Sequence, residues 1–347
     1  MRRQHVMSRL AIAAAAGLAA ALALGTDGAS AQTVVNKIKD RGYVVCSGSQ
    51  GVPGLSRPDE QGVWRGFDTD ICRAFAVAIL GDREKIRFVP LNAAQRLPAV
   101  QTGEIDILSR TSTITYTRDT AIRFVAVTLY DNDGLLVRKS LDITDKKQLD
   151  GLTVCLQGGG SLTEKAVLET EEEFGIEMKK VYFDATIQAR DAYFAGRCDS
   201  YVTDGTAAAG QRATVAKNPD EHDIIVMGEG TEPNGVAIAY GDDQLFNAVR
   251  WTINALLWAE SKGITQANID EKLASGDAEI SRVLGREAGF GKAIGLDDKW
   301  AYNVIKQVGN YAEIWDRNLG ASSPLKVPRG MNALYRDGGV NFPFPWD

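Results

Sequence analysis

The sequence predicts an α/β fold built from two similar lobes. Strand-like and helix-like segments alternate from residue 43 onward, which is the pattern of α/β architecture. The same order of elements recurs after residue 153, and the motif Ala-x3-Gly-x2-Asp begins both at residue 99 and at residue 192. A motif this short also arises by chance, so the shared order of elements gives the stronger support for a duplicated unit.

The first half contains two helix patterns and three strand patterns. Residues 67–80 place Ile71, Phe75, Ala78 and Ile79 on one face, which predicts an amphipathic helix. A second helix is expected at residues 94–102. Short apolar runs predict strands at residues 43–47, 86–90 and 105–109.

The second half repeats this order. Strands are expected at residues 153–157, 180–183 and 200–203, and helices at residues 162–174 and 187–195. Ligands of open parallel sheets bind beyond the carboxyl ends of the strands. Two facing lobes therefore predict a cleft, with the chain passing between the lobes near residues 125–135 and 228–236.

The last third of the chain is helical and then irregular. Residues 245–274 form a strongly helical tract, in which Trp251, Leu256, Leu257 and Trp258 recur at helical spacing. This spacing favours core packing as the role of the tryptophans. The tail from residue 322 to residue 347 is rich in Pro and Gly, and we expect an extended segment strapped over the surface.

The N-terminus has the features of an export signal. Arg2, Arg3 and Arg9 form a basic region, residues 10–24 form an apolar run, and residues 29–31 read Ala-Ser-Ala, a small-x-small cleavage site. The apolar run is shorter than the roughly 20 residues of a membrane-spanning helix. We therefore expect residues 1–31 to be a cleaved signal peptide and the remainder to be exported to the periplasm.

Composition excludes several classes of function. The formal net charge of −6 argues against nucleic acid as a partner. Cys46, Cys72, Cys155 and Cys198 contain no Cys-x2-Cys pair, so a zinc site is not expected, and an oxidising compartment favours disulfides with three possible pairings. Beyond the leader the chain has a single histidine, His222, which argues against a histidine metal site and against a Ser/His/Asp triad. We predict no metal and no cofactor.

Three segments carry candidate binding chemistry. The first, residues 108–119, follows a strand and is crowded with hydroxyls before it reaches Arg118. Such a segment suits a carboxylate, which Arg118 could grip with two parallel hydrogen bonds. The alternative is a solvated turn with a surface arginine.

The second segment joins a strand to a helix and reads Gln-Gly-Gly-Gly-Ser over residues 157–161. Consecutive glycines free the backbone to approach a ligand, and a helix N-terminus offers unpaired N–H donors to an anion. A phosphate-binding loop is excluded because neither GxxxxGK[ST] nor GxGxxG with its required partners follows. The alternative is a flexible turn.

The third segment ends an apolar strand at Asp204. An acid at this point could accept hydrogen bonds from an ammonium group, or it could cap the helix that begins at Thr206. Together the three segments supply an arginine, a group of donors and an acid from two lobes. That set is complementary to a zwitterion, and charge-assisted bonds of about 1.5–3 kcal/mol each suffice for micromolar affinity.

These residues resemble a known family, the polar amino-acid-binding proteins of ABC importers (solute-binding family 3), and within it the general L-amino-acid-binding proteins. The resemblance runs over nearly the whole chain after the leader. Its most specific parts are the segments 66–71 (Gly-Phe-Asp-Thr-Asp-Ile), 95–99 (Gln-Arg-Leu-Pro-Ala), 109–119, 241–244 (Gly-Asp-Asp-Gln), 249–252 (Val-Arg-Trp-Thr), 300–302 (Trp-Ala-Tyr), 306–311 (Lys-Gln-Val-Gly-Asn-Tyr) and 329–334 (Arg-Gly-Met-Asn-Ala-Leu).

The resemblance implies a type II periplasmic binding protein fold, with two doubly wound lobes joined by a hinge. Lobe I would comprise residues 32–128 and 233–347, including a C-terminal extension, and lobe II residues 129–232. The function implied is the capture of free L-amino acids, including Glu, Gln, Asp and Asn, by a monomer that delivers them to the permease subunits of an inner-membrane ABC transporter. A periplasmic dehydratase on the same fold and a sensor for a membrane receptor are the alternatives.

By the same resemblance, the ligand-binding residues can be assigned. Arg118 would bind the α-carboxylate, assisted by Thr113 and by Gly160 and Ser161. Asp204 would bind the α-ammonium with the Thr111 carbonyl, Arg96 would face an acidic side chain or its amide, and Gln50 would form a wall. The glycine turn departs from the family's usual Gly-Thr-Thr, and Gly51 and Ala93 stand where narrower members carry aromatics, which predicts a roomy pocket.

The resemblance also suggests a disulfide pairing. Cys46 and Cys155 occupy matching strand positions in the two halves. One bridge in each lobe is therefore expected, Cys46–Cys72 and Cys155–Cys198.

Overall fold

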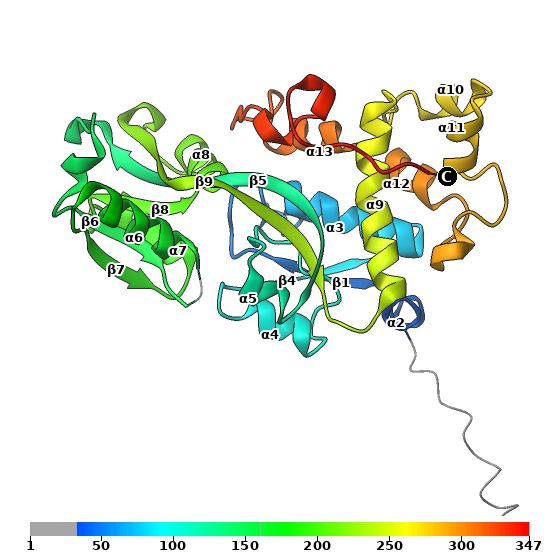
Figure 1. Cartoon of the computed structure of the whole chain (residues 1–347), viewed down its shortest axis with the longest axis horizontal. Coiled ribbons are helices and arrows are strands. Elements are labelled where there is room, and N and C mark those ends of the chain that lie inside the picture. Colours follow the sequence, from blue (N-terminus) through cyan, green and yellow to red (C-terminus); the bar gives the residue numbers. More distant parts are fainter. Residues whose placement is uncertain (1–32, 160, 347) are drawn as a thin grey trace, which may run out of the picture. The chain divides into compact units, whose positions relative to one another are not determined.

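The computed structural model describes residues 33–159 and 161–346 (Figure 1). The predicted signal peptide, residues 1–31, lies outside the described residues. Helices and strands alternate from residue 34, which confirms the predicted α/β class. Within the described residues, no helix is long and apolar enough to cross a membrane.

The first α/β region is built on a short parallel sheet. Strand β1 (Val44–Gly48) pairs in parallel with β4 (Ile86–Pro90). Helix α3 (Phe67–Leu80) joins them and is buried from end to end apart from Leu80. Helix α2 (Val34–Arg41) precedes β1, and the short helices α4 (Arg96–Gln101) and α5 (Tyr116–Asp119) follow β4. The strand expected at residues 105–109 is reduced to isolated bridges, which join residue 107 to β1 and residue 108 to residue 237.

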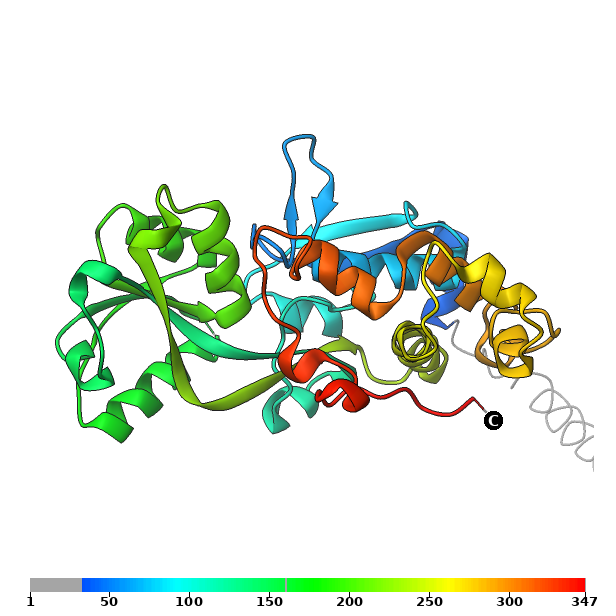
Figure 2. The same ribbon diagram turned by 90° about the horizontal axis from the view of Figure 1, so that it is seen from above.

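A small hairpin connects β1 to α3. Strands β2 (Arg57–Pro58) and β3 (Trp64–Arg65) pair antiparallel, and Figure 2 shows this blue hairpin projecting from its neighbours. Gly66 follows β3 with a φ of 129°, and a Cβ there would lie 2.2 Å from the carbonyl oxygen of Leu55. Only glycine therefore permits this close approach at the start of α3.

Two long antiparallel strands, β5 (Arg123–Arg138) and β9 (His222–Ile238), carry the chain into and out of the second α/β region (Figure 1). They occupy one side of a five-stranded sheet with the order β7-β6-β8-β5-β9. The other strands are β6 (Thr153–Gln157), β7 (Lys179–Phe183) and β8 (Ser200–Asp204), and the helices are α6 (Thr163–Phe174), α7 (Thr186–Phe194) and α8 (Gly205–Thr214). Three register shifts in the β5–β9 pair show that these strands are bent.

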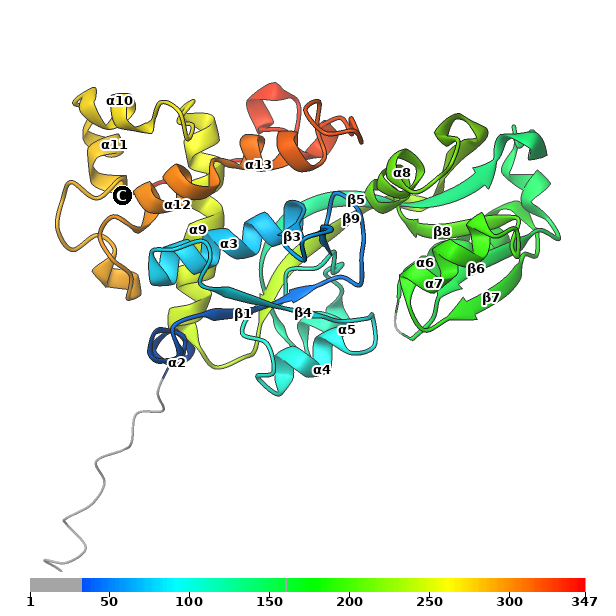
Figure 3. The ribbon, with the colours of Figure 1, turned by 180° about the vertical axis from the view of Figure 1, so that it is seen from behind.

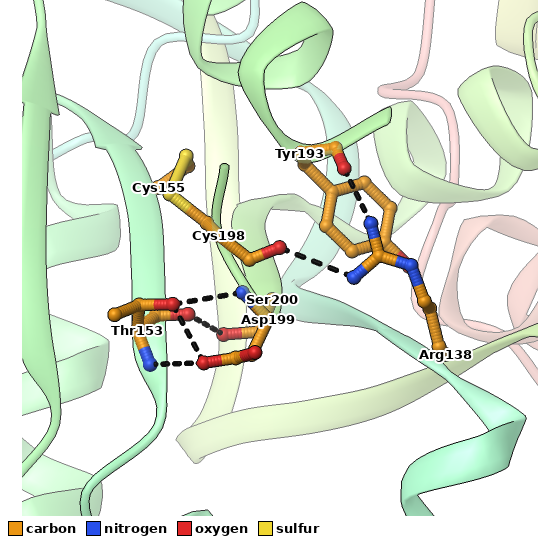
Figure 4. The surroundings of a disulfide bond; sticks show 7 residues. All are labelled: Arg138, Thr153, Cys155, Tyr193, Cys198, Asp199 and Ser200. Carbon is orange, nitrogen blue, oxygen red and sulfur yellow. Dashed lines mark hydrogen bonds between the residues drawn. A yellow bond between two sulfur atoms is a disulfide. The ribbon is translucent and has the colours of Figure 1, made fainter. Parts of the chain in front are cut away.

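The repeated motif has the same local role in both regions. Asp106 accepts a hydrogen bond from the backbone N–H of Val45 in β1, at 2.7 Å. Asp199 accepts one from the backbone N–H of Thr153 in β6, at 2.8 Å, and a second from the Thr153 hydroxyl (Figure 4). In each case the acid of the motif ties the turn after a helix to the first strand of its region.

Two disulfides cross-link the two regions internally. Cys46–Cys72 joins β1 to α3, and Cys155–Cys198 joins β6 to the turn before β8. This is the pairing that the resemblance suggested. Beside the second bridge, the Arg138 guanidinium donates to the carbonyl oxygens of Tyr193 and Cys198, which fixes the turn from both sides (Figure 4).

The C-terminal third is helical, as expected, but the tract is broken. Helix α9 (Asp243–Ser261) ends just before Gly263, which has a φ of 64°, and α10 (Ile269–Ala274) begins a new direction. Helices α11 (Ala278–Val283), α12 (Trp300–Val308) and α13 (Tyr311–Asn318) follow (Figure 3). The tail then crosses α9, where the Asn254 side chain accepts from the Phe344 N–H and donates to its carbonyl.

Tryptophans pack together under this tail. Trp346 lies 4.8 Å from Trp251, 6.1 Å from Trp258 and 6.2 Å from Trp300, measured between ring centroids. Trp258 and Trp300 are fully buried, so the core-packing interpretation of the helical tract is correct for Trp258. The tail is an irregular strap with a buried end.

The apolar cores are largely separate. One pair of clusters draws on residues 135–227, namely on β5, β6, β8 and the helices packed on them. The other pair draws almost wholly on residues 35–129 and 236–346. The two α/β regions are thus stabilised by their own cores, while β5 and β9 contribute to both.

Candidate functional site

Polar side chains from both α/β regions line one pocket. Five of the predicted ligand-binding residues are in its lining: Arg96, Thr111, Thr113, Ser161 and Asp204. Further polar lining residues, which were not among the predicted ligand-binding residues, are Arg110, Asp133, Gln157, Thr163, Thr186, Thr203 and Glu232. The pocket lies beyond the ends of β6 and β8, where ligands of parallel sheets bind.

Arg118 lies directly behind this lining. Its Nη1 donates to the Thr113 carbonyl oxygen at 3.0 Å, and its own N–H is capped by the Thr115 hydroxyl. The residue is only 7% exposed. The alternative of a surface arginine on a solvated turn is therefore wrong, and the guanidinium fixes the backbone of a lining residue.

Arg96 and Thr111 contact each other in the pocket wall. The Nη1 of Arg96, on the first turn of α4, donates to the Thr111 carbonyl oxygen at 3.0 Å. The resemblance assigned that carbonyl to the ligand ammonium. It already accepts one hydrogen bond, which leaves one lone pair for a ligand.

Asp204 stands at the N-cap position of α8 but does not cap the helix. The backbone N–H of Thr206 instead donates to Asp131 on β5, at 3.1 Å to Oδ1. The N-cap alternative for Asp204 is therefore wrong. Its carboxylate remains available to the pocket because another acid satisfies the helix terminus.

The glycine-rich turn contributes mainly through its last residues. The hydroxyls of Ser161 and Thr163 lie 2.8 Å apart at the start of α6, and both residues line the pocket. Gly159 has a φ of 70°, which glycine adopts without strain. Gly160 lies outside the described residues. Gln50 is not in the lining, although its Oε1 is buried without a partner in the described part of the chain.

Acids from the two long strands are in the pocket lining. Glu232 on β9 accepts a hydrogen bond from the Thr113 hydroxyl at 2.8 Å. Burial, followed by the charges of Glu232 and Asp204, raises the pKa of Asp133 to about 9, so protonated Asp133 can donate to Glu232. Burial and Glu232 also raise the pKa of Asp204 to about 6, against the opposing effect of Arg110 and Arg96.

Arginines line the same pocket or lie directly behind it. Burial lowers the pKa of Arg96, Arg110 and Arg118, and the neighbouring guanidiniums lower that of Arg96 further. These cations have been brought close together out of water, which is unfavourable unless anions accompany them. The pocket therefore combines buried cations with acids, an arrangement that complements a ligand carrying both charges.

Sequence reasoning missed Arg110, Asp133 and Glu232 for identifiable reasons. Arg110 lies inside the hydroxyl-rich segment, where only Arg118 was given a role. Asp133 and Glu232 lie on the chain crossings expected near residues 125–135 and 228–236, so an acid in each crossing was the available signal. No group of His, Cys, Asp or Glu in the part that the structure describes could hold a metal ion.

Comparison with known proteins identifies the family. Residues 44–271 match the model of the bacterial extracellular solute-binding proteins, family 3. The chain belongs to this family. Its fold is the type II periplasmic binding protein fold that the resemblance implied.

Full-length relatives agree with this assignment. The general L-amino acid-binding periplasmic protein of Rhizobium johnstonii is 44% identical, over 98% of this chain and 99% of its own length. The glutamate/glutamine/aspartate/asparagine-binding protein of Rhodobacter capsulatus is 39% identical, over 94% and 97%. A solved periplasmic binding protein of an ABC transporter from Brucella ovis, with glutathione bound, has a TM-score of 0.86 at 40% identity and covers 90% of this chain and 99% of that one.

Proposed function

We propose that this protein captures free L-amino acids in the periplasm and delivers them to the membrane subunits of an ABC transporter. The observation that carries the proposal is the release of Asp204 from capping α8, which leaves a carboxylate facing a pocket otherwise rich in buried arginine. An α-amino acid has an ammonium for Asp204 and a carboxylate for the side that Arg118 supports. The names of the relatives from Rhizobium and Rhodobacter point to the same ligands.

In this proposal the carboxylate is bound by the Thr113 segment and the Ser161 turn. Arg118 holds the Thr113 carbonyl at 3.0 Å and supplies positive charge behind it. The hydroxyls of Ser161 and Thr163 and the N-terminus of α6 add donors from the second region. Residues 32–128 with 233–347, and residues 129–232, would act as two lobes that close on the ligand about β5 and β9.

A γ-glutamyl peptide is a second candidate ligand, because the Brucella relative holds glutathione. The glutamyl end of glutathione carries a free ammonium and α-carboxylate, so it presents the same head group as an amino acid. Both candidates would use Asp204 and Arg118 in the same way. They differ in how much room and charge the pocket must supply beyond the head group.

Calorimetric titration of refolded, ligand-free protein tests the proposal. The panel contains L-amino acids, their D-isomers and glutathione. Micromolar binding of several L-amino acids, and none of the D-isomers, is expected. Binding of glutathione alone would favour the second candidate. Absence of binding to every ligand of the panel would overturn both.

An enzyme would be detected in the same samples. Asp133 has a raised pKa and could transfer protons, so each bound ligand should be recovered and its NMR spectrum recorded after prolonged incubation. A binding protein leaves the ligand unchanged. Capture of permease subunits from inner membranes by the loaded protein would distinguish delivery to a transporter from presentation to a sensory receptor.

A further inference from the structure

The C-terminal motif Arg-Gly-Met-Asn-Ala-Leu, at residues 329–334, has no part in the binding scheme described so far. It lies beyond residues 44–271, the part of the chain that matches the family model. Asn332 of this motif is only 5% exposed, and its side-chain amide pairs with the backbone of Tyr130 on β5. The Tyr130 N–H donates to Asn332 Oδ1 at 2.7 Å, and Asn332 Nδ2 donates to the Tyr130 carbonyl oxygen at 2.8 Å. One side chain thus takes the place of a neighbouring strand.

Strand β5 needs such a partner at Tyr130. The pairing of β5 with β8 covers only residues 133–137 and so ends before Tyr130. On the other side Tyr130 stands opposite Pro233 of β9, which has no N–H to donate, and the register shifts both before and after this pair. Backbone N–H and C=O groups away from water must find partners. Asn332 satisfies both groups, so it fixes the course of β5 where the pairing between strands is irregular.

Asn332 is itself held by the helical C-terminal third. Its backbone carbonyl accepts from the Arg329 guanidinium at 2.8 Å. Arg329 in turn donates to Glu260 on α9 at 2.9 Å, and its guanidinium carbon lies 5.1 Å from the centroid of the Tyr311 ring on α13. The Tyr311 hydroxyl donates to the Thr128 carbonyl oxygen on β5, at 2.8 Å. Helices α9 and α13 therefore hold β5 at two nearby points through this network.

The next two residues of β5 contact the start of α8. Asp131 accepts from the backbone N–H of Thr206 at 3.1 Å. A Cβ at residue 205 would overlap the side chain of Asn132, so glycine at that position lets β5 and α8 meet closely. Asp204, directly before the helix, makes no capping hydrogen bond while Asp131 satisfies the helix terminus. A shift of this part of β5 would therefore move the cap of α8 and change what Asp204 contacts.

We propose that Asn332 is a positioning residue of the ligand site. It holds β5 so that Asp131 caps α8, and this leaves the Asp204 carboxylate for the ligand ammonium. The inference rests on the proposed function, because it takes Asp204 as the partner of that ammonium. It gives the C-terminal segment a part in ligand affinity besides its part in packing.

The test compares two asparagines that make the same kind of contact. Asn332→Ala removes both hydrogen bonds to Tyr130. Asn254→Ala is the matched control, because Asn254 is 3% exposed and pairs reciprocally with the backbone of Phe344 at 2.6 and 3.2 Å, in the last residues of the tail. Asn332→Ser, which keeps one short polar group, is the second variant should Asn332→Ala not fold. Each protein is titrated calorimetrically with L-glutamate and L-glutamine, and its thermal unfolding is recorded.

Both alanine variants should lose thermal stability to a similar extent, because each loses two buried hydrogen bonds. Only the Asn332 variants should also bind the amino acids more weakly, by at least about fivefold, the equivalent of one net hydrogen bond. Wild-type affinity in the Asn332 variants, or an equal loss of affinity in Asn254→Ala, would overturn the inference. Absence of binding by the wild type would refute the proposed function, and the inference with it.

The route through Asp131 is tested by a double-mutant cycle. Asp131→Ala is combined with Asn332→Ala, or with Asn332→Ser where the first pair does not fold. If Asn332 acts through Asp131, the double variant should bind within about twofold of the weaker-binding single variant. Losses of affinity that multiply would show that the two residues act independently, which would overturn the positioning role.

Discussion

The carboxylate of Asp131 accepts a hydrogen bond from the backbone N–H of Thr206, with 3.1 Å between N and Oδ1. Asp131 lies on β5 and Thr206 in the first turn of α8, so the strand caps a helix from a distant part of the sequence. The residue that local sequence would choose as the cap, Asp204, makes no capping hydrogen bond. A cap supplied from elsewhere is what leaves Asp204 to the pocket.

Replacing Asp131 tests whether this residue caps α8 in place of Asp204. Asp131→Ala removes the acceptor and should lower the free energy of unfolding by about 1 kcal/mol, a usual value for loss of a helix cap. It should also weaken ligand binding, since the freed N–H of Thr206 would then compete for Asp204. Asp131→Asn keeps the Oδ1 acceptor and is the control. Urea unfolding that shows equal stability for the two variants would contradict the account.

Removing either end of the proposed clamp should reduce affinity. Asp204→Asn takes away the charge that faces the ammonium, and Arg118→Met takes away the charge behind Thr113. Each loss corresponds to a charge-assisted contact of about 1.5–3 kcal/mol, so the dissociation constant should rise at least tenfold. Calorimetry measures this, with Arg65→Met as the control. Wild-type affinity in both variants would refute the site assignment.

Affinity should depend on pH through Asp204. Its pKa in the ligand-free protein is raised to about 6, mainly by burial and by Glu232. An ammonium is best held by the ionised carboxylate, so affinity should be highest above pH 6 and fall by up to about tenfold for each pH unit below it. The dissociation constant measured at pH 5 should therefore exceed that at pH 8. Asp204→Asn should lack this dependence, and an identical pH profile in wild type and variant would be inconsistent with it.

Stability should depend on pH in the opposite sense through Asp133. Burial and the neighbouring acids raise its pKa from 3.8 to about 9, so the folded protein holds a proton that the unfolded chain releases. The resulting stabilisation is complete below about pH 4 and is lost as the pH rises toward 9. Between pH 5 and pH 8, the free energy of unfolding of the ligand-free wild type should fall by at least about 1 kcal/mol more than that of Asp133→Asn, which carries no such proton. Urea unfolding at the two pH values measures these changes. An equal change in the free energy of unfolding for wild type and variant would disprove the prediction.

Local patterns were sufficient to predict most elements around the site. Helix α3 and strands β4 and β6 have the predicted bounds, because their apolar spacing is regular and glycine or turn residues mark their ends. The prediction of a strand at residues 105–109 is wrong. This segment makes only single bridges to β1 and β9, so no continuous ladder forms. The helical tract was predicted without its break at Gly263, since one glycine within a helical pattern does not by itself fix a bend.

The pocket was harder to predict than the fold. Arg118 and Asp204 could be chosen from the sequence because each follows a strand end. Asp131 and Glu232 gain their roles only from contacts with Thr206 and Thr113, which lie 75 and 119 residues away in sequence. Such partners are set by the pairing of β5 with β9 and by the packing of α8, and no local pattern contains that information.

The central claim, a clamp for both charges of an amino acid, is tested most directly by titrating the wild-type protein with L-glutamate and with 2-oxoglutarate. The two ligands share both carboxylates, and only the first carries the ammonium assigned to Asp204. We expect micromolar affinity for L-glutamate and binding at least tenfold weaker for 2-oxoglutarate, the minimum for loss of a charge-assisted contact. Equal affinity for the two ligands would contradict it, because Asp204 would then make no contribution to recognition.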